Sequence, residues 1–364
     1  MEAFKPLRRE ELGVLVRKLR KAAEEGGVVD ISEKIGAMNE DIAYKMVLGR
    51  NKDNRFDIKA IVEEGIFLMG AFNISDFVPC LSALDIQGLT KRIKKVSTII
   101  DSLLETIIED HEQVSMTRSG KQGHQEDFVD MLLSLTNKPL KLNDEQVYYL
   151  DRTNVKAILL DMIVAAFDTS TATIVWSLAE LLRHPRVMKN LQEELQSLIG
   201  MDRMVEETDL PKLSYLSMVV KESLRLHPTA PLLVAHESIE DITINGYDIP
   251  KKSRIIVNIW TIGRDPNVWS ENVEEFYPER FMNNNIELQG HDFQLIPFGS
   301  GRRGCPGLQL GLTTIQLVLA QLVHCFNWGL PTGLLPQDLD MTEKFGLSMS
   351  KAKHLLSKPT YRLM

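Results

Sequence analysis

A twenty-residue apolar run, AILLDMIVAAFDTSTATIVW at positions 157–176, constrains the fold more than any other stretch of this 364-residue chain. Asp161 and Asp168 interrupt the run, so it is predicted to be a helix buried inside a folded domain rather than a membrane span. Such a helix needs other elements to cover it. The hydrophobic content of 44% is enough to build that core, as one large domain or two ordinary ones.

Net charge and cysteine content exclude some classes of function. The net charge of −8 argues against a nucleic-acid-binding protein, which normally shows a basic excess. Cys80, Cys305 and Cys325 are too far apart for a C-x-x-C metal site and too few for a disulfide framework. The charged, helix-patterned N-terminal stretch contains neither a signal peptide nor a membrane span.

Helical spacing of apolar residues dominates the first two thirds of the chain. Helices are predicted over residues 9–25, 31–49, 90–111, 128–135, about 146–184, 185–200 and 214–227, and a mobile surface loop over 112–127. After Pro228 the pattern changes to β-branched runs around Asn245-Gly246, a strong hairpin signal. A last long helix over 308–326 and a β-type tail complete a mainly α, α+β fold.

The stretch QLIPFGSGRRGCPGLQLGL, residues 294–312, contains the spacing G-x-G-x-x-G between Gly299 and Gly304. A dinucleotide-binding loop also needs a strand before it, a helix from its third glycine and an acidic residue about 20 residues later. Pro306 interrupts such a helix, and the first acid after the loop is Asp338. The glycine spacing is therefore interpreted as a coincidence.

The same stretch also spells F-x-x-G-x-R-x-C-x-G, and each of these positions has a physical task if Cys305 is an iron ligand. A helix that begins just after the cysteine, with Pro306 near its first turn, points free N–H groups and its positive end at the thiolate. The other four positions suit a flat cofactor. Gly301 and Gly307 let the backbone approach it closely, Arg303 can pair with a carboxylate, and Phe298 offers an aromatic face. The alternatives are a buried structural cysteine, or a catalytic nucleophile. A nucleophile would need a histidine base, which the sequence does not assign; His291 is one candidate.

Three further phrases occur in the order typical of one family. Glu222-Ser223-Leu224-Arg225 has the form E-x-x-R, and Pro278-Glu279-Arg280-Phe281 has the form P-E-R-F. Ala165-Ala166-Phe167-Asp168-Thr169-Ser170 lies inside the central apolar helix. With the cysteine loop, these phrases resemble the cytochrome P450 haem-thiolate monooxygenases, and the phrase N-I-W-T-I-G-R-D-P is similar to plant microsomal members. The resemblance covers residues 1–364 as a single domain of the P450 fold with small β-sheets.

The resemblance implies a role for each matched residue. Cys305 is the expected thiolate ligand of the iron in haem b, and Thr169 and Asp168 are expected to serve oxygen binding and proton delivery. Glu222, Arg225 and Arg280 are expected to form a structural ion network. Two positions depart from the family pattern: Ala166 replaces a common glycine, and His236 stands where relatives carry an arginine that pairs with a haem propionate.

The implied reaction inserts one oxygen atom of O2 into a lipophilic small molecule, with electrons from NADPH through NADPH–cytochrome P450 reductase. The expected substrate-facing residues lie near Phe72, in 159–166, in 230–234 and in 345–347, and they are largely apolar. No nucleic-acid partner is expected. The resemblance places such enzymes on the cytosolic face of the endoplasmic reticulum membrane, in plant specialised metabolism.

The family's membrane anchor, first strands and the helix carrying W-x-x-x-R have no counterpart in this sequence, so it is expected to be an N-terminally truncated fragment. Trp260–Arg264 has that spacing but lies in the I-G-R-D-P phrase. The alternative function is therefore a haem-poor, inactive or partner-binding form of such an enzyme, and without its anchor the chain is expected to be soluble.

Overall fold

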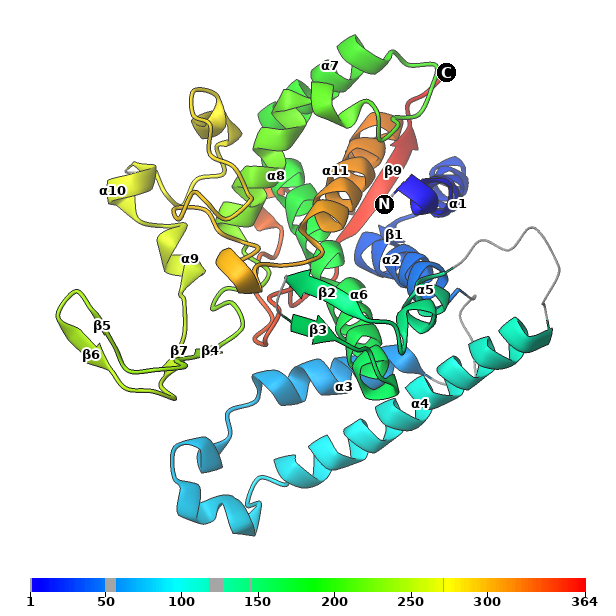
Figure 1. Ribbon diagram of the computed structural model, residues 1–364. Coiled ribbons are helices and arrows are strands. Elements are labelled where there is room, and N and C mark those ends of the chain that lie inside the picture. The colour runs from blue at the N-terminus through cyan, green and yellow to red at the C-terminus, as the bar shows by residue number, and fades with distance from the viewer. Residues whose placement is uncertain (1, 50–56, 118–126, 144–145, 271) are drawn as a thin grey trace. The chain divides into compact units, whose positions relative to one another are not determined.

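The computed structural model describes residues 2–49, 57–117, 127–143, 146–270 and 272–364 (Figure 1). The chain forms two compact units, the first from residues 1–11 and 36–168 and the second from residues 12–35 and 169–364. The main helices are α1 (Lys5–Glu24), α2 (Ile31–Leu48), α3 (Ile58–Gly70), α4 (Leu89–Thr117), α5 (Phe128–Leu135), α6 (Arg152–Arg183), α7 (Pro185–Ile199), α8 (Ser214–Leu226) and α11 (Leu308–Cys325). Short turns of helix include α9 (Ile259–Ile262), α10 (Pro266–Trp269) and the 3-10 helices η2 (Ile74–Asp76), η3 (Pro79–Leu84), η5 (Pro278–Phe281) and η6 (Gly301–Arg303).

The strands are short and antiparallel. They are β1 (Val29–Asp30), β2 (Leu140–Asn143), β3 (Gln146–Tyr148), β4 (His236–Glu237), β5 (Ile242–Ile244), β6 (Tyr247–Ile249), β7 (Arg254–Ile255), β8 (Phe326–Gly329) and β9 (Leu356–Tyr361). β1, β9 and β8 form a three-stranded sheet, while β2–β3, β4–β7 and β5–β6 are two-stranded pairs. The predicted helix-dominated α+β class is confirmed.

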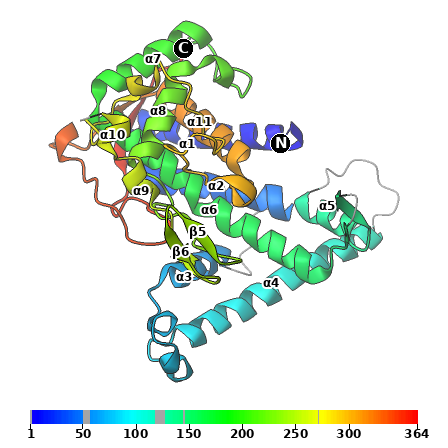
Figure 2. The same cartoon turned by 60° about the vertical axis from the view of Figure 1, so that its left-hand side comes forward.

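The first unit is built around an apolar cluster on its helices. Tyr44 and Leu48 of α2, Ile107 of α4 and Leu159 of α6 are fully buried there. α3 and α4 pack together and are joined through the 3-10 turns η2 and η3 (Figure 2). Leu159 and Ile163, which were expected to face the substrate, belong instead to this core because their spacing places them on its covered face.

The second unit packs α11 against α7 and α8. α11 is covered on nearly all sides from Thr313 to Cys325, which explains its apolar composition. β8 continues directly from its end and pairs with β9, with Phe326 opposite Tyr361. The C-terminal strand β9 also pairs with β1, with Val29 opposite Ser357, so the sheet joins segments far apart in sequence.

The central helix differs from its prediction in one respect. Residues 172–182 of α6 are all buried, but in residues 157–170 only Leu159 and Ile163 are, and Asp161 and Thr169 are exposed. The expectation of a helix buried throughout is therefore wrong for its first half. By length and composition α6 and α11 could each cross a membrane, a test that the core helix of a folded domain also passes.

Two other predictions need correction. α4 continues to Thr117, so residues 112–117 are helical rather than part of a loop, while 118–126 lie outside the described residues. α6 begins only at Arg152, because the β-prone residues Val147 and Tyr148 form the β2–β3 pair before it. The predicted hairpin at Asn245-Gly246 is confirmed: both residues have positive φ, and Ile244 pairs with Tyr247.

Candidate functional site

Cys305 lies on a closed loop that precedes α11. The Cys305 amide donates a hydrogen bond of 2.8 Å to the Phe298 carbonyl, which joins the two ends of the loop. Between them η6 makes a tight turn in which the Gly304 amide donates to the Gly301 carbonyl at 3.0 Å. Gly301 has φ of 71°, a left-handed conformation that a side chain at this position would strain. The loop therefore presents the exposed Cys305 side chain from a defined backbone.

The thiol lies at the N-terminal end of a long apolar helix. α11 begins at Leu308, with Gly307 as its N-cap residue, so Pro306 lies just before the first turn, near it as predicted. Gly307 has no side chain to cap the helix, and the first turn leaves backbone N–H groups free of intrahelical partners. The positive end of the helix dipole favours a negative charge here, which suits a thiolate.

The three cysteines differ in what they can do. Cys325, at the other end of α11, is buried, and burial raises the pKa of its thiol to about 12. Such a thiol is not a ligand or nucleophile near neutral pH. Cys80 is exposed but lies in η3, in the other unit and away from the loop sequence. Cys305 is therefore the cysteine that combines exposure with a helix N-terminus.

α6 approaches the Cys305 loop closely. A β-carbon added at Gly311, in the first turn of α11, would lie 3.9 Å from Phe298 Cε1 and 3.9 Å from Ser170 Oγ. Ser170 follows Thr169 on α6, so the turn that carries Thr169 lies beside the first turn of α11. Asp168 is half-buried at the preceding position of the same helix. The structure thus places the loop and the Thr169 turn together.

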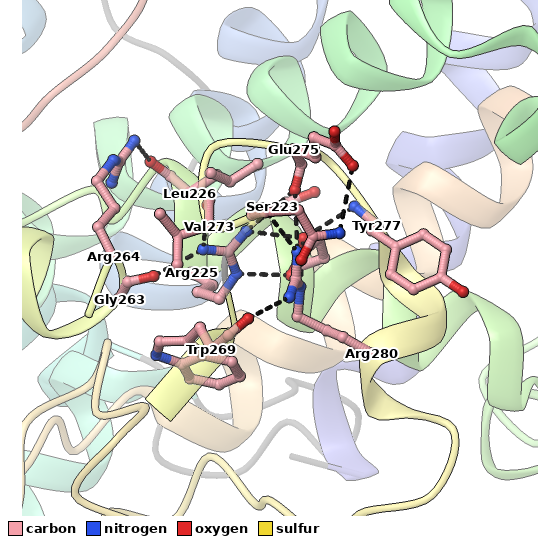
Figure 3. Close-up of polar contacts among 12 residues, drawn as sticks. Ser223, Arg225, Leu226, Gly263, Arg264, Trp269, Val273, Glu275, Tyr277 and Arg280 are labelled. Atoms are coloured by element: carbon pink, nitrogen blue, oxygen red, sulfur yellow. Dashed lines mark hydrogen bonds and ion pairs between the residues drawn. The ribbon is translucent and has the colours of Figure 1, made fainter. Parts of the chain in front are cut away.

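Glu222, Arg225 and Arg280 form a buried ion network. Both carboxylate oxygens of Glu222 accept hydrogen bonds of 2.8 Å from Arg225, and neither side chain is exposed to solvent. Arg280 Nε donates to Glu222 Oε1 at 2.9 Å, and the Tyr277 amide donates to the same oxygen at 2.9 Å (Figure 3). A buried carboxylate with this set of donors is fully compensated.

The remaining guanidinium hydrogens hold the segment that follows α9. Arg225 donates to the carbonyls of Gly263 and Val273, at 2.6 Å and 2.7 Å, and Arg280 donates to that of Trp269 at 2.9 Å (Figure 3). Gly263 is required at its position because a β-carbon there would lie 2.6 Å from the Arg225 carbonyl oxygen. The network therefore fastens residues 263–277 onto α8 and has a structural role.

A second buried carboxylate, Glu180 of α6, was not identified from the sequence. Glu180 Oε1 lies 2.7 Å from His227 Nε2, and Glu180 Oε2 lies 3.2 Å from His184 Nδ1. Burial raises the pKa of Glu180, but the contacts with His184 and His227 outweigh it and lower that pKa from 4.5 to about 2. The contact with the carboxylate also raises the pKa of His184. The i, i+4 spacing of Glu180 and His184 was the only local signal in the sequence.

The other predicted residues lie in more open positions. Arg303 is exposed at the end of η6, and His236 is exposed on β4, where it pairs with Ile255 of β7. Phe298 is half-buried between the loop and α11. Among the expected substrate-facing residues, Val234 and Phe345 are strongly exposed.

These residues fit a haem. A single soft thiolate ligand is a known way for proteins to hold haem iron, and the loop exposes one thiol with a half-buried aromatic ring nearby. Arg303 is exposed in the same loop and is able to pair with a carboxylate. The donor set thus agrees with a thiolate-bound iron porphyrin rather than with a Cys–His metal site.

Comparison with known proteins gives the same result. A family model described as cytochrome P450 matches residues 1–356. Cytochrome P450 CYP736A12 of Panax ginseng is 57% identical over 363 residues, which cover 100% of this chain and 72% of that protein. Flavonoid 3'-monooxygenase of Arabidopsis thaliana is 40% identical over 372 residues, which cover 100% of this chain and 71% of that protein.

A solved structure shows the same fold. A zebrafish cytochrome P450 determined with abiraterone superposes with a TM-score of 0.77 at 24% sequence identity, covering 99% of this chain and 78% of that chain. The family match spans nearly the whole sequence, and the plant relatives include a monooxygenase. The chain therefore belongs to the cytochrome P450 family, and it is a monooxygenase of that family.

Proposed function

We propose that Cys305 binds the iron of haem b and that the enzyme inserts one atom of O2 into a C–H bond of a lipophilic small molecule. The second oxygen atom leaves as water, so each turnover consumes two electrons and two protons. NADPH supplies the electrons through NADPH–cytochrome P450 reductase. One observation carries this proposal: the exposed Cys305 lies at the start of α11, and the Thr169 turn of α6 packs beside that start.

The haem, when bound, supplies the redox chemistry that activates O2. The protein's residues bind this group and deliver protons to the site. Cys305 donates electron density as a thiolate at the helix end. Thr169 positions a hydroxyl for hydrogen bonding next to the reacting centre, and Asp168 passes protons from solvent to it. When haem is bound, Arg303 and His236 would pair with its propionates.

The substrate class follows from the apolar residues exposed in the second unit. Leu232, Val234 and Phe345 are exposed apolar side chains, with Phe345 93% accessible. These side chains lie in segments that the family resemblance assigns to the substrate side, and exposed apolar side chains there favour a lipophilic substrate. Because a relative at 40% identity is named flavonoid 3'-monooxygenase, flavonoids are the first compounds to test.

The link between α3 and α4 suits a lipid surface, and we place the enzyme on the endoplasmic reticulum membrane. Phe72, Phe77, Leu84 and Ile86 are between 61% and 68% exposed, and the two phenylalanine rings stack at 5.1 Å. The adjacent start of α4 reads LTKRIKK, with its basic side chains exposed. Apolar side chains beside a basic stretch bind anionic lipid headgroups and insert between them.

An isotope experiment tests the proposed reaction. The chain with bound haem, a plant reductase and NADPH is incubated under ¹⁸O₂ with a panel of flavanones, flavones and flavonols. The proposal predicts product that carries a single ¹⁸O atom. A Thr169→Ala variant is expected to consume NADPH but release most of the electrons as peroxide, whereas exposed Thr243→Ala, outside the site, is expected to behave as wild type. Product oxygen drawn from water would contradict the proposal.

A further inference from the structure

Three side chains on α6, one, two and three turns beyond Thr169, face the segments that follow α8 and precede β9. They are Thr173, Trp176 and Glu180, whose spacing of three and four residues puts them on one face of the helix with Thr169. All three are buried. Their partners are His227, Thr229 and Met349, which also belong to the second unit.

The hydrogen bonds of the two threonines have a fixed direction. Thr173 Oγ1 lies 3.1 Å from the Thr169 carbonyl oxygen and 3.0 Å from Thr229 Oγ1. A carbonyl only accepts, so the single hydroxyl hydrogen of Thr173 goes to Thr169. The hydroxyl of Thr229 therefore donates to Thr173. At 3% and 9% exposure, neither side chain has water as a ready substitute.

Two more bonds close a ring between the segments. The Met349 amide donates to the Thr229 carbonyl at 2.7 Å, and Trp176 Nε1 donates to the Met349 carbonyl at 3.0 Å. The ring thus passes from α6 through residues 229 and 349 and returns to α6. Trp176 also stacks on His227, with ring centroids 4.2 Å apart and planes 2° from parallel. His227 bonds to Glu180, which holds residues 227–229 at a third point on α6.

We infer that Thr173 and Thr229 are positioning residues that fix the Thr169 peptide and couple the segments 230–234 and 345–349 to it. A hydroxyl bonded to the carbonyl four residues earlier competes with the helix hydrogen bond to that carbonyl. The Thr173 hydroxyl therefore holds the peptide from which the Thr169 side chain extends. Because this inference rests on the proposed function of Thr169, a substrate that displaces either apolar segment is expected to adjust the proton-delivering hydroxyl.

The chemical consequence concerns where electrons go. With Thr169 held in place, two electrons and two protons convert O2 and substrate into hydroxylated product and water. With the ring open, the same two electrons and two protons reduce O2 to hydrogen peroxide, and the substrate stays unchanged. The fraction of NADPH that ends as peroxide is therefore the property that the ring controls.

The variants separate the ring from the rest of the helix. Thr173→Val and Thr229→Val remove hydroxyls with little change of shape, and Thr173→Ser keeps the hydroxyl. Ser177→Ala is the matched control, because Ser177 Oγ is equally buried and donates to the Thr173 carbonyl at 2.8 Å outside the ring. Peroxide per NADPH is measured with reductase and the flavonoid that wild-type enzyme oxidises in the isotope experiment.

Both valine variants are expected to raise the peroxide fraction and the hydrogen–deuterium exchange rate of the Met349 amide by about fivefold, the effect of losing one hydrogen bond. Thr173→Ser and Ser177→Ala are expected to stay near wild type in both. Faster amide exchange with an unchanged peroxide fraction would show that the ring has only a structural role, and would overturn the inference. Unchanged amide exchange would show that the hydroxyls do not hold the segments together, and would overturn it as well. If wild type oxidises no compound of the panel, the proposed function fails, while the exchange measurement still decides whether the ring holds the segments.

Discussion

At the scale of single residues, two buried carboxylates lead to testable predictions about stability. Glu180 and Glu222 are both buried carboxylates, yet their nearest partners differ. Two histidines lie closest to Glu180, with Arg183 Nη1 farther away at 3.9 Å, whereas two arginines donate hydrogen bonds to Glu222. An arginine stays charged at every accessible pH, whereas a histidine loses its charge near neutrality. The first carboxylate is therefore tested by a change of pH and the second by mutation.

Glu180 is expected to make a contribution to the free energy of unfolding that is lost at acid pH. Its folded pKa of about 2 lies below the ordinary value of 4.5, so the ionised form stabilises the fold above pH 4.5. This stability, about 3 kcal/mol when fully present, is lost as the pH falls from 4.5 towards 2. Glu180→Gln removes this contribution, so the difference in melting temperature between wild type and variant is expected to shrink over that window. A constant difference would contradict this assignment.

Substitution of Glu222, whose partners are arginines, is expected to destabilise the fold. Glu222→Gln leaves Arg225 and Arg280 buried without a countercharge, which costs about 3–5 kcal/mol of unfolding free energy. Thermal unfolding of the purified protein measures this loss. The control is Glu193→Gln, which removes an exposed contact with Lys189 at 3.6 Å and is expected to cost less than about 1 kcal/mol. Equal losses of unfolding free energy in the two variants would show that the buried network stabilises the fold no more than an exposed ion pair does.

At the scale of elements, the sequence predicted the helices well because their apolar periodicity is a local property. α7, α8 and α11 end within a residue or two of their predicted bounds. The two-residue strand β1 and the four-residue β8 were not predicted, because both depend on pairing with β9. The motif residues around Cys305 could be chosen from spacing, whereas the Thr173–Thr229 contact, 56 residues apart, has no sequence signal.

The short helix α5 depends on its first residues. Asp127 caps it by accepting a hydrogen bond of 3.0 Å from the Asp130 amide, and His111 Nε2 lies 3.0 Å from the other Asp127 oxygen. Asp127→Ala removes the cap and the ion pair, and is expected to speed amide exchange across Phe128–Leu135 by roughly tenfold. Asp127→Asn keeps the cap and is expected to have a smaller effect. If both variants exchange equally fast, the cap does not hold the helix.

At the scale of the whole molecule, the apolar link between α3 and α4 predicts attachment to lipid. Flotation with phosphatidylcholine vesicles containing phosphatidylserine is expected to carry the wild-type chain, and less of it at high salt. Leu84→Asp and Phe77→Asp are expected to reduce flotation severalfold, because each places a charge among inserting side chains. Ile239→Asp, at a residue 73% exposed elsewhere on the chain, is the control. Equal losses for all three variants would count against a defined lipid-binding surface.

The central claim is that the Cys305 thiolate binds haem iron, and the carbon monoxide difference spectrum of the reduced protein tests it most directly. The chain is produced with haem supply as wild type, Cys305→His and Cys80→Ser, the last changing another exposed cysteine. Wild type and Cys80→Ser are expected to show the red-shifted Soret band of a thiolate-bound iron, and Cys305→His is expected to lose it. Absence of haem uptake by the wild type, or a thiolate band that survives in Cys305→His, would contradict the account.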